Sequence, residues 1–113
     1  MFRESAKLLL DTLFDRVYDL ESFLNWDINE REEALEIKIP EISSVYLIHQ
    51  HNALEQIWLS SPISGGWHFV FNPKHGWIDT RGKRPFFLML FSEFKPYIPE
   101  FLWKSSWLEE KSA

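Results

Sequence analysis

Carboxylates near the start of the chain have a spacing that could bind cations. Asp11, Asp15 and Asp19 are four residues apart, so a helix would place them in one stripe. Like charges at this spacing disfavour an isolated helix by about 0.2–0.5 kcal/mol per pair, and a merely soluble face could avoid that cost. We interpret the stripe as a carboxylate ridge for cations. A solvated helix face is the alternative interpretation.

The ridge continues beyond this stripe, into the strand and turn that follow the predicted helix. The further acids are Asp27, Glu30, Glu32, Glu33 and Glu36. Oxygen ligands in a chain without cysteine suit hard cations, including ferrous and ferric iron, calcium, magnesium and manganese. Because the acids are spread over a convex surface, waters would complete the coordination sphere. We therefore expect weak, multiple and poorly selective binding.

Two histidines form a second candidate for metal binding. His49 and His51 are two residues apart, so on an extended strand they share a face and could chelate a transition metal. A pair at a strand edge in water is the simpler interpretation. His75 falls in a predicted turn.

The segment 54–79 predicts three strands with one face that should contact water. Apolar residues alternate along it, and we place Ile57, Leu59, Phe69 and Phe71 in the core. The opposite face then carries Trp58 with Gln56, Ser60 and His68. An exposed aromatic ringed by polar groups is typical of an interaction surface. The alternative is that a loop or the C-terminal tail covers Trp58.

The elements that must position these residues follow from hydrophobic periodicity. An apolar stripe predicts a helix over 4–22 and a nearly all-apolar run predicts a second helix over 86–94. Strands are predicted over 24–30, 35–39, 44–49, 55–60, 67–71 and 77–79. The fold class is α+β, a two-layer α/β sandwich with an antiparallel sheet of about six strands and both helices on one face.

The last residues are predicted to be separate from this domain. We assign 1–96 to the domain and 97–113 to a C-terminal extension, packed on it or flexible beside it. Residues 99–111 could form a short amphipathic helix with Trp103 and Trp107 one turn apart. This extension could close the core between the helices, or be a partner-binding or membrane-surface segment.

Composition narrows the classes of partner. Residues 1–41 hold eleven acids and five bases, which gives −6, and residues 42–113 hold six acids and seven bases, which gives +1. The acidic part favours a metal ion or a basic protein patch and disfavours nucleic acid. The chain has no 18-residue apolar run, so we expect no membrane span. The absence of cysteine and of a recognisable leader at the start leads us to expect a cytoplasmic location.

Catalytic motifs do not emerge from the sequence. Ser60 and Ser61 are not set in G-x-S-x-G, and no phosphate loop, H-E-x-x-H or EF-hand pattern occurs. We expect a protein that is not an enzyme. An iron-oxidising enzyme is a remaining alternative, and it would need fixed ligands.

Four motifs together resemble a known family. They are Q-I-W-L-S-S-P, S-G, G-W-H-F and G-W-I-D, between residues 56 and 79. This pattern resembles the frataxin family, over about residues 6–95, and the G-x-H-F version is similar to its bacterial CyaY branch.

The resemblance implies an iron-binding protein of iron–sulfur cluster assembly that docks on a cysteine desulfurase and its scaffold protein. It implies weakly bound iron on Asp11, Asp15, Asp19, Glu21 and Asp27. It implies partner contacts at Gln56, Trp58, Ser60 and His68. It is also compatible with a monomer that forms iron-dependent oligomers.

Two departures from the family pattern keep an alternative open. The segment 22–25 stands where further carboxylates are expected, and His49 stands where the family usually has asparagine. The thinner ridge favours a metal-independent protein-interaction module as the second hypothesis.

Overall fold

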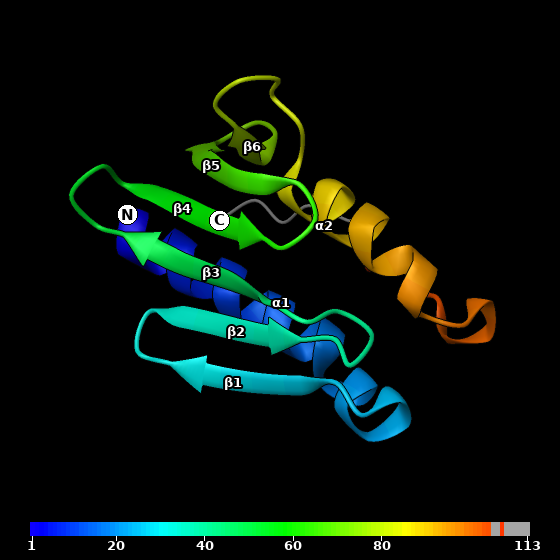
Figure 1. Cartoon of the computed structure of the whole chain (residues 1–113). Helices are drawn as coiled ribbons and strands as arrows, with labels where there is room; N and C mark the ends of the chain where they lie inside the picture. Colours follow the sequence, from blue (N-terminus) through cyan, green and yellow to red (C-terminus); the bar gives the residue numbers. More distant parts are fainter. Residues whose placement is uncertain (105–106, 108–113) are drawn as a thin grey trace.

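The computed structural model describes residues 1–104 and residue 107. Two α-helices frame six strands, and two short 3₁₀ turns follow (Figure 1). The elements are α1 (Phe2–Leu24), β1 (Asp27–Arg31), β2 (Ala34–Lys38), β3 (Val45–His51), β4 (Gln56–Ser61), β5 (Gly65–Asn72), β6 (Gly76–Asp79), α2 (Phe86–Phe94), η1 (Lys95–Tyr97) and η2 (Glu100–Leu102).

The strands form one antiparallel sheet in the order of the chain, β1 to β6. Both helices lie on the same side of this sheet, behind it in the view of Figure 1. This confirms the predicted two-layer α+β sandwich. It also makes β1 an edge strand that runs beside α1, which is where the acids concentrate.

The core lies between the sheet and the helices. Alternate residues of the strands point inward, as Ile37, Ile57 and Phe69 do, and each is fully buried. Leu13 of α1 and Phe91 of α2 cover them from the other layer and are also fully buried. Neither helix of the described part of the chain covers the opposite face of the sheet in Figure 1.

The first helix is longer than predicted at both ends. It continues to Leu24, and Asn25 then ends it with a φ of 58°, in the left-handed region that asparagine tolerates. The strand predicted over 24–30 was therefore wrong at its start, since β1 begins at Asp27. Trp26 lies between the two elements and is buried against Phe94, with ring centroids 5.1 Å apart.

The bounds of the other strands differ from prediction by at most two residues, and α2 has the predicted bounds. β5 begins at Gly65 because Gly65 and Gly66 pair with Ser61 and Ser60 of β4. Glycines carry no side-chain periodicity, so the alternation could not show that they belong to the strand.

The C-terminal segment packs against the helices. The predicted amphipathic helix is wrong over the described part of 99–111, because a 3₁₀ turn ends at Leu102 and Trp103 is extended. Trp107 is 2% exposed and stacks on Phe91 at 5.2 Å, and Arg16 of α1 donates a hydrogen bond to its carbonyl oxygen at 2.7 Å. These contacts close the core between α1 and α2. The boundary at residue 96 stays a prediction, and residues 105, 106 and 108–113 lie outside the described part.

A helix suited to crossing a membrane is not found among the described residues.

Candidate cation-binding ridge and docking face

The predicted acidic ridge is distributed over α1 and the edge strand β1. Asp11 and Asp15 are exposed on α1, Asp19 is half-buried one turn further on, and Asp27 is exposed at the start of β1. The helical spacing predicted this stripe for the three aspartates of α1. The sheet order then places β1 beside the helix, so the acids share one rim of the molecule.

Three of the five predicted ligands already have partners within the chain. Lys7 Nζ lies 2.6 Å from Asp11 Oδ2, and this hydrogen bond, followed by the charge of Asp11, raises the pKa of Lys7. Lys104 Nζ lies 3.2 Å from Asp19 Oδ2. The two pairs are more than half exposed on average, so each contributes little to stability, and a cation can compete for either carboxylate.

Glu21 has a structural contact. Its Oε2 accepts a hydrogen bond at 3.1 Å from the backbone N–H of Ile28. This bond ties the end of α1 to β1 and supplies the edge strand with an acceptor that the sheet does not provide. Iron binding at Glu21 would compete with this bond.

Asp15 and Asp27 are the two predicted ligands with no hydrogen-bond or ion-pair partner within the described residues. The same part of the chain contains no group of three or more histidine or acidic side chains placed to hold a metal ion. A bound cation would therefore meet one or two carboxylates at a time and keep most of its waters. The arrangement can attract hard cations but does not enclose them.

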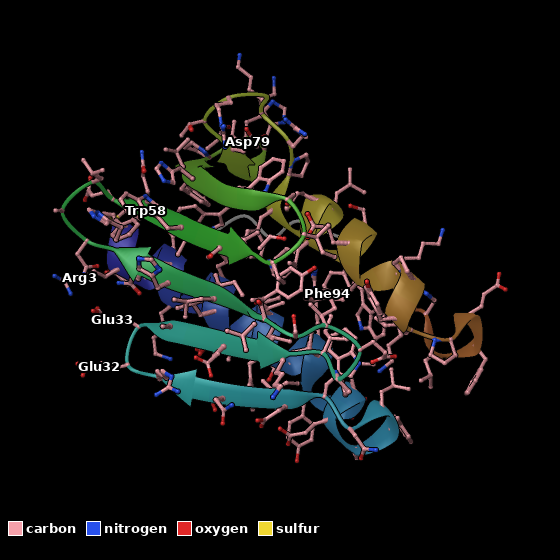
Figure 2. All side chains as sticks on the ribbon, in the orientation of Figure 1. Arg3, Glu32, Glu33, Trp58, Asp79 and Phe94 are labelled. Carbon is pink, nitrogen blue, oxygen red and sulfur yellow. The ribbon has the colours of Figure 1, made fainter. Side chains whose placement is uncertain are left out.

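A cleft of about 340 Å³ separates the start of α1 from the β1–β2 turn. Charges of both signs line it, among them Arg3, Lys7, Asp11 and Glu33. Glu33 accepts hydrogen bonds from Arg3, Gln50 and Asn52 at 3.1–3.3 Å, so it joins α1 to the β3–β4 turn. Figure 2 labels Arg3 and Glu33 at this end of the sheet. The sequence identified Glu33 only as an acid of the ridge, because its partners come from distant segments.

The second candidate site is the outer face of the sheet around Trp58 (Figure 2). Trp58 lies directly across from His49 on β3 and His68 on β5. Its indole stacks on His68 at 4.2 Å with an interplanar angle of 7°, and on His51 at 4.0 Å and 22°. His49 approaches the same ring edge-on at 5.8 Å.

The predicted contact residues surround this indole. Trp58 Nε1 donates a hydrogen bond to Gln56 Oε1 at 2.8 Å. Ser60 and His68 are exposed on the same face, and Ser60 pairs with Gly66. The structure therefore brings together all four predicted residues. Trp58 is half-buried. Among the described residues, the imidazoles of His51 and His68 stack on it, whereas the predicted alternative was cover by a loop or the C-terminal tail.

The sequence did not indicate the contribution of His51 to this face. Its Nδ1 accepts a hydrogen bond from the backbone N–H of Leu54 at 3.2 Å, so one of its two nitrogens is already used. The Nδ1 of His49 is buried and has no hydrogen-bond partner in the described part of the chain. Burial, followed by the charge of His51, lowers the pKa of His49. Both rings belong to the cluster around Trp58, and this cluster can be recognised only once the register between β3 and β4 is known.

The chain is similar to proteins of a known family. The model of the frataxin-like domain matches residues 1–100. The mitochondrial frataxin homolog of Schizosaccharomyces pombe is 32% identical over 92 residues, which cover 78% of this chain. The match spans 58% of that relative's own length.

Solved structures of frataxins share the fold of this chain. Trimeric frataxin from Saccharomyces cerevisiae, complexed with ferrous, has a TM-score of 0.73 at 26% identity and covers 83% of this chain and 85% of its own. Frataxin of Psychromonas ingrahamii, described within the CyaY family, has a TM-score of 0.62 at 22% identity and covers 84% and 90%. Matches to both yeast and bacterial proteins leave the CyaY branch a prediction. By its sequence match over residues 1–100 and by its fold, the chain belongs to the frataxin family.

Proposed function

We propose that this chain is a non-enzymatic, iron-binding frataxin that modulates iron–sulfur cluster assembly. In this proposal it docks on a cysteine desulfurase and its scaffold protein through the outer face of the sheet. The acidic ridge presents weakly held iron, ferrous or ferric, or negative charge to the same complex.

The outer sheet face is the observation that carries the proposal. It is the layer that neither helix covers, and it presents Trp58 with hydrogen-bonding neighbours. Tryptophan at the centre of a contact surface is typical of residues that dominate binding energy. The indole is held in place by two stacked rings, so little side-chain entropy remains to be lost on docking.

Replacement of Trp58 tests the docking face. We expect Trp58→Ala to weaken binding to the desulfurase–scaffold complex by about 2 kcal/mol or more, roughly 30-fold, measured by titration calorimetry. Leu54→Ala is the matched control, because Leu54 is 57% exposed and lies in the β3–β4 turn, outside the strands that form this face. Equal affinity for wild type and Trp58→Ala would remove the docking face from the proposal.

Anaerobic titration with ferrous iron tests the ridge. We expect amide signals next to Asp15 and Asp27 to broaden first, because these carboxylates have no described partner to displace. Signals next to Asp11 and Asp19 should follow at higher iron, after Lys7 and Lys104 are displaced. Asp79 is buried and serves as the internal control. An unchanged spectrum at millimolar iron would contradict iron binding.

A metal-independent interaction module is the second candidate function. The pairing of Asp11 with Lys7 and of Asp19 with Lys104 favours it, since both acids are then partly neutralised. Under this function the ridge only steers a basic surface of the partner. The absence of any response to iron, together with docking that depends on Trp58, would identify it.

The proposal also covers the oligomeric state, the location and the absence of catalysis. A trimeric yeast relative complexed with ferrous supports a monomer that assembles when iron is present. The cytoplasmic location stays a prediction from the sequence. Ferrous oxidation above the rate in buffer alone would contradict the non-enzymatic assignment.

A further inference from the structure

The loop between β6 and α2 carries positive charge that the proposed function does not use. Residues 80–84 have the sequence T-R-G-K-R, and Arg81, Lys83 and Arg84 are exposed. Asp79 precedes the loop and pairs with Arg84 at 3.5 Å, but the side chain of this aspartate is only 2% exposed. Within the described residues, Arg81 and Lys83 have no ion-pair partner. This segment, the basic loop, therefore presents uncompensated positive charge to its surroundings.

Hydrogen bonds hold the backbone of the basic loop in one conformation. The Asp79 carboxylate accepts from the backbone N–H groups of Arg81, Gly82 and Arg84 at 2.6–2.9 Å, and the Asp79 carbonyl oxygen accepts from the Lys83 N–H at 3.1 Å. Lys83 has a φ of 56°, a left-handed conformation that persists in a residue with a side chain only where the surrounding contacts impose it. The loop is therefore preorganised, which reduces the entropy lost when a partner binds.

The basic loop continues the proposed docking face. The Thr80 N–H donates to the carbonyl oxygen of His68 at 2.9 Å, and Arg81 Nη2 donates to the carbonyl oxygen of Gly66 at 2.7 Å. His68 and Gly66 are themselves paired across β4 with two of the predicted contact residues. A partner that covers those contact residues therefore meets the basic loop at the rim of the same face.

The two rims of the outer face carry charge of opposite sign. β1 forms one edge of the sheet, beside the acidic ridge, whereas the basic loop follows β6 at the other edge (Figure 1). On β1 and β2 themselves, charges of both signs balance, because Arg31 pairs with Glu36 at 3.4 Å and Lys38 lies opposite Asp27. A partner rotated by half a turn would bring like charges together, which opposes binding. The charge pattern therefore favours one orientation of the partner on Trp58.

We infer that the basic loop binds an acidic segment of the protein that docks on Trp58, and that this contact fixes the orientation of the complex. The inference rests on the proposed docking function and adds the chemistry of the partner surface at this rim. A guanidinium group has five N–H donors, so Arg81 keeps donors for a carboxylate after its bond to Gly66. Lys83 adds an ammonium group that has no ion-pair partner in the described part of the chain.

A protein carboxylate fits the basic loop better than a nucleic acid or an anionic membrane does. Phosphate-rich partners are held by clusters of many lysines and arginines, whereas this loop offers three such residues and Asp79 pairs with one of them. The net charge of −5 also repels a large polyanion. A short acidic segment contacts the loop alone and stays away from the acidic ridge at the other edge of the sheet.

Removal of the charges on the basic loop tests this contact in the docked complex. We expect Arg81→Gln/Lys83→Gln to weaken docking on the desulfurase–scaffold complex by about five-fold, the effect of two exposed ion pairs of ordinary strength, measured by titration calorimetry at low salt. Glutamine keeps an N–H donor for the Gly66 carbonyl oxygen. The sign of the effect is specific, because this variant is more negative than wild type and would bind more tightly to a partner surface that is basic throughout.

Lys74→Gln/Lys95→Gln is the matched control. It removes the same amount of charge from two exposed lysines outside the basic loop, one in the β5–β6 turn and one at the start of η1, so it should bind within about two-fold of wild type or more tightly. If Arg81→Gln/Lys83→Gln binds as tightly as this control, the inference is overturned. If Trp58→Ala binds like wild type, the proposed docking function fails instead, and a titration without the complex still decides the role of the basic loop.

Titration of the chain alone with hexaglutamate supplies that readout. We expect the amide signals of Gly82 and Lys83 to shift, and those of Lys74 and Lys95 to shift much less. Inorganic phosphate and a single-stranded oligonucleotide, matched in total charge, are the comparison probes and should shift the loop signals less than hexaglutamate does. Equal shifts at all of these lysines, or loop shifts at least as large with either comparison probe, would overturn the inference.

Discussion

Single carboxylates in this chain have different tasks according to their surroundings. Asp79 is 3% exposed and accepts hydrogen bonds from the backbone N–H groups of Arg81, Gly82 and Arg84 at 2.6–2.9 Å. Burial alone would raise the pKa of Asp79, but these donors and the charge of Arg84 outweigh it and hold the pKa below its usual value. Asp79 therefore organises the turn into α2, whereas the exposed Asp15 is available to solvent and cations.

Substitution of Asp79 should show how much its hydrogen bonds contribute to the free energy of unfolding. We expect Asp79→Asn to lower the free energy of unfolding by about 1–3 kcal/mol at pH 7, because an amide replaces one acceptor with a donor. Since the folded-state pKa is lowered, the stabilisation is complete above the unfolded pKa of about 3.9 and is lost as pH falls through the folded value. Urea unfolding at pH 7 and pH 3 should show the difference from wild type shrinking in acid.

Asp15→Asn is the matched control for that experiment. It makes the same chemical change at an exposed position and should shift the free energy of unfolding by no more than about 0.5 kcal/mol. Similar losses for the two variants would mean that the backbone hydrogen bonds of Asp79 carry no special weight.

Residue positions were predictable where they depend only on alternation. The period of two placed Trp58 and His68 together on the outer face, and the register confirms that they are directly opposite. The stacking of His51 on Trp58 was not predictable, because it requires the length of the β3–β4 turn and the rotamers of both rings. The hydrogen bond from the Ile28 N–H to Glu21 was also not predictable from the sequence, because it depends on where α1 ends.

At the scale of elements, the C-terminal segment behaves as part of the core. Trp107 stacks on Phe91 and lies 5.6 Å from Trp103, while Arg16 lies over Phe87 at 4.1 Å and bonds the Trp107 carbonyl. The segment thus covers the seam between α1 and α2. Its two tryptophans were identified from the sequence, but the helical spacing predicted for them was wrong because the chain turns in 3₁₀ and extended conformations.

Truncation of Trp107 should therefore destabilise the whole domain. We expect Trp107→Ala to lower the free energy of unfolding by about 3–5 kcal/mol, the usual range for removing a large buried aromatic. Phe101→Ala is the control, because Phe101 is 84% exposed and its loss should change stability by about 0.5 kcal/mol or less. Equal, small effects in thermal and urea unfolding would show that the segment only rests on the surface.

The molecule as a whole separates its charge from the proposed docking face. The net charge of −5 arises in residues 1–41, which carry −6 and form α1, β1 and β2. The centre of the outer face carries Trp58 with the histidine rings stacked on it and the uncharged polar residues Gln56 and Ser60. The order of the strands produces this division, because it places β1 at one edge of the sheet and β4 and β5 near its centre. Composition predicted the charge asymmetry. Only the order of the strands in the sheet shows that the acids lie apart from Trp58.

This division predicts how salt affects docking. Exposed charges act beyond contact distance and are screened over about 10 Å at 0.1 M salt, so the ridge should raise the association rate more than the lifetime of the complex. We expect the association rate with the desulfurase–scaffold complex to fall about ten-fold between 20 and 500 mM salt in iron-free buffer, and the dissociation rate to change much less. Stopped-flow fluorescence separates the two rates.

Asp15→Asn/Asp27→Asn should give a shallower salt dependence of association, whereas Trp58→Ala should keep the wild-type slope and dissociate faster. A steep salt dependence in the dissociation rate alone would contradict the steering role and place the acids in direct contact with the partner.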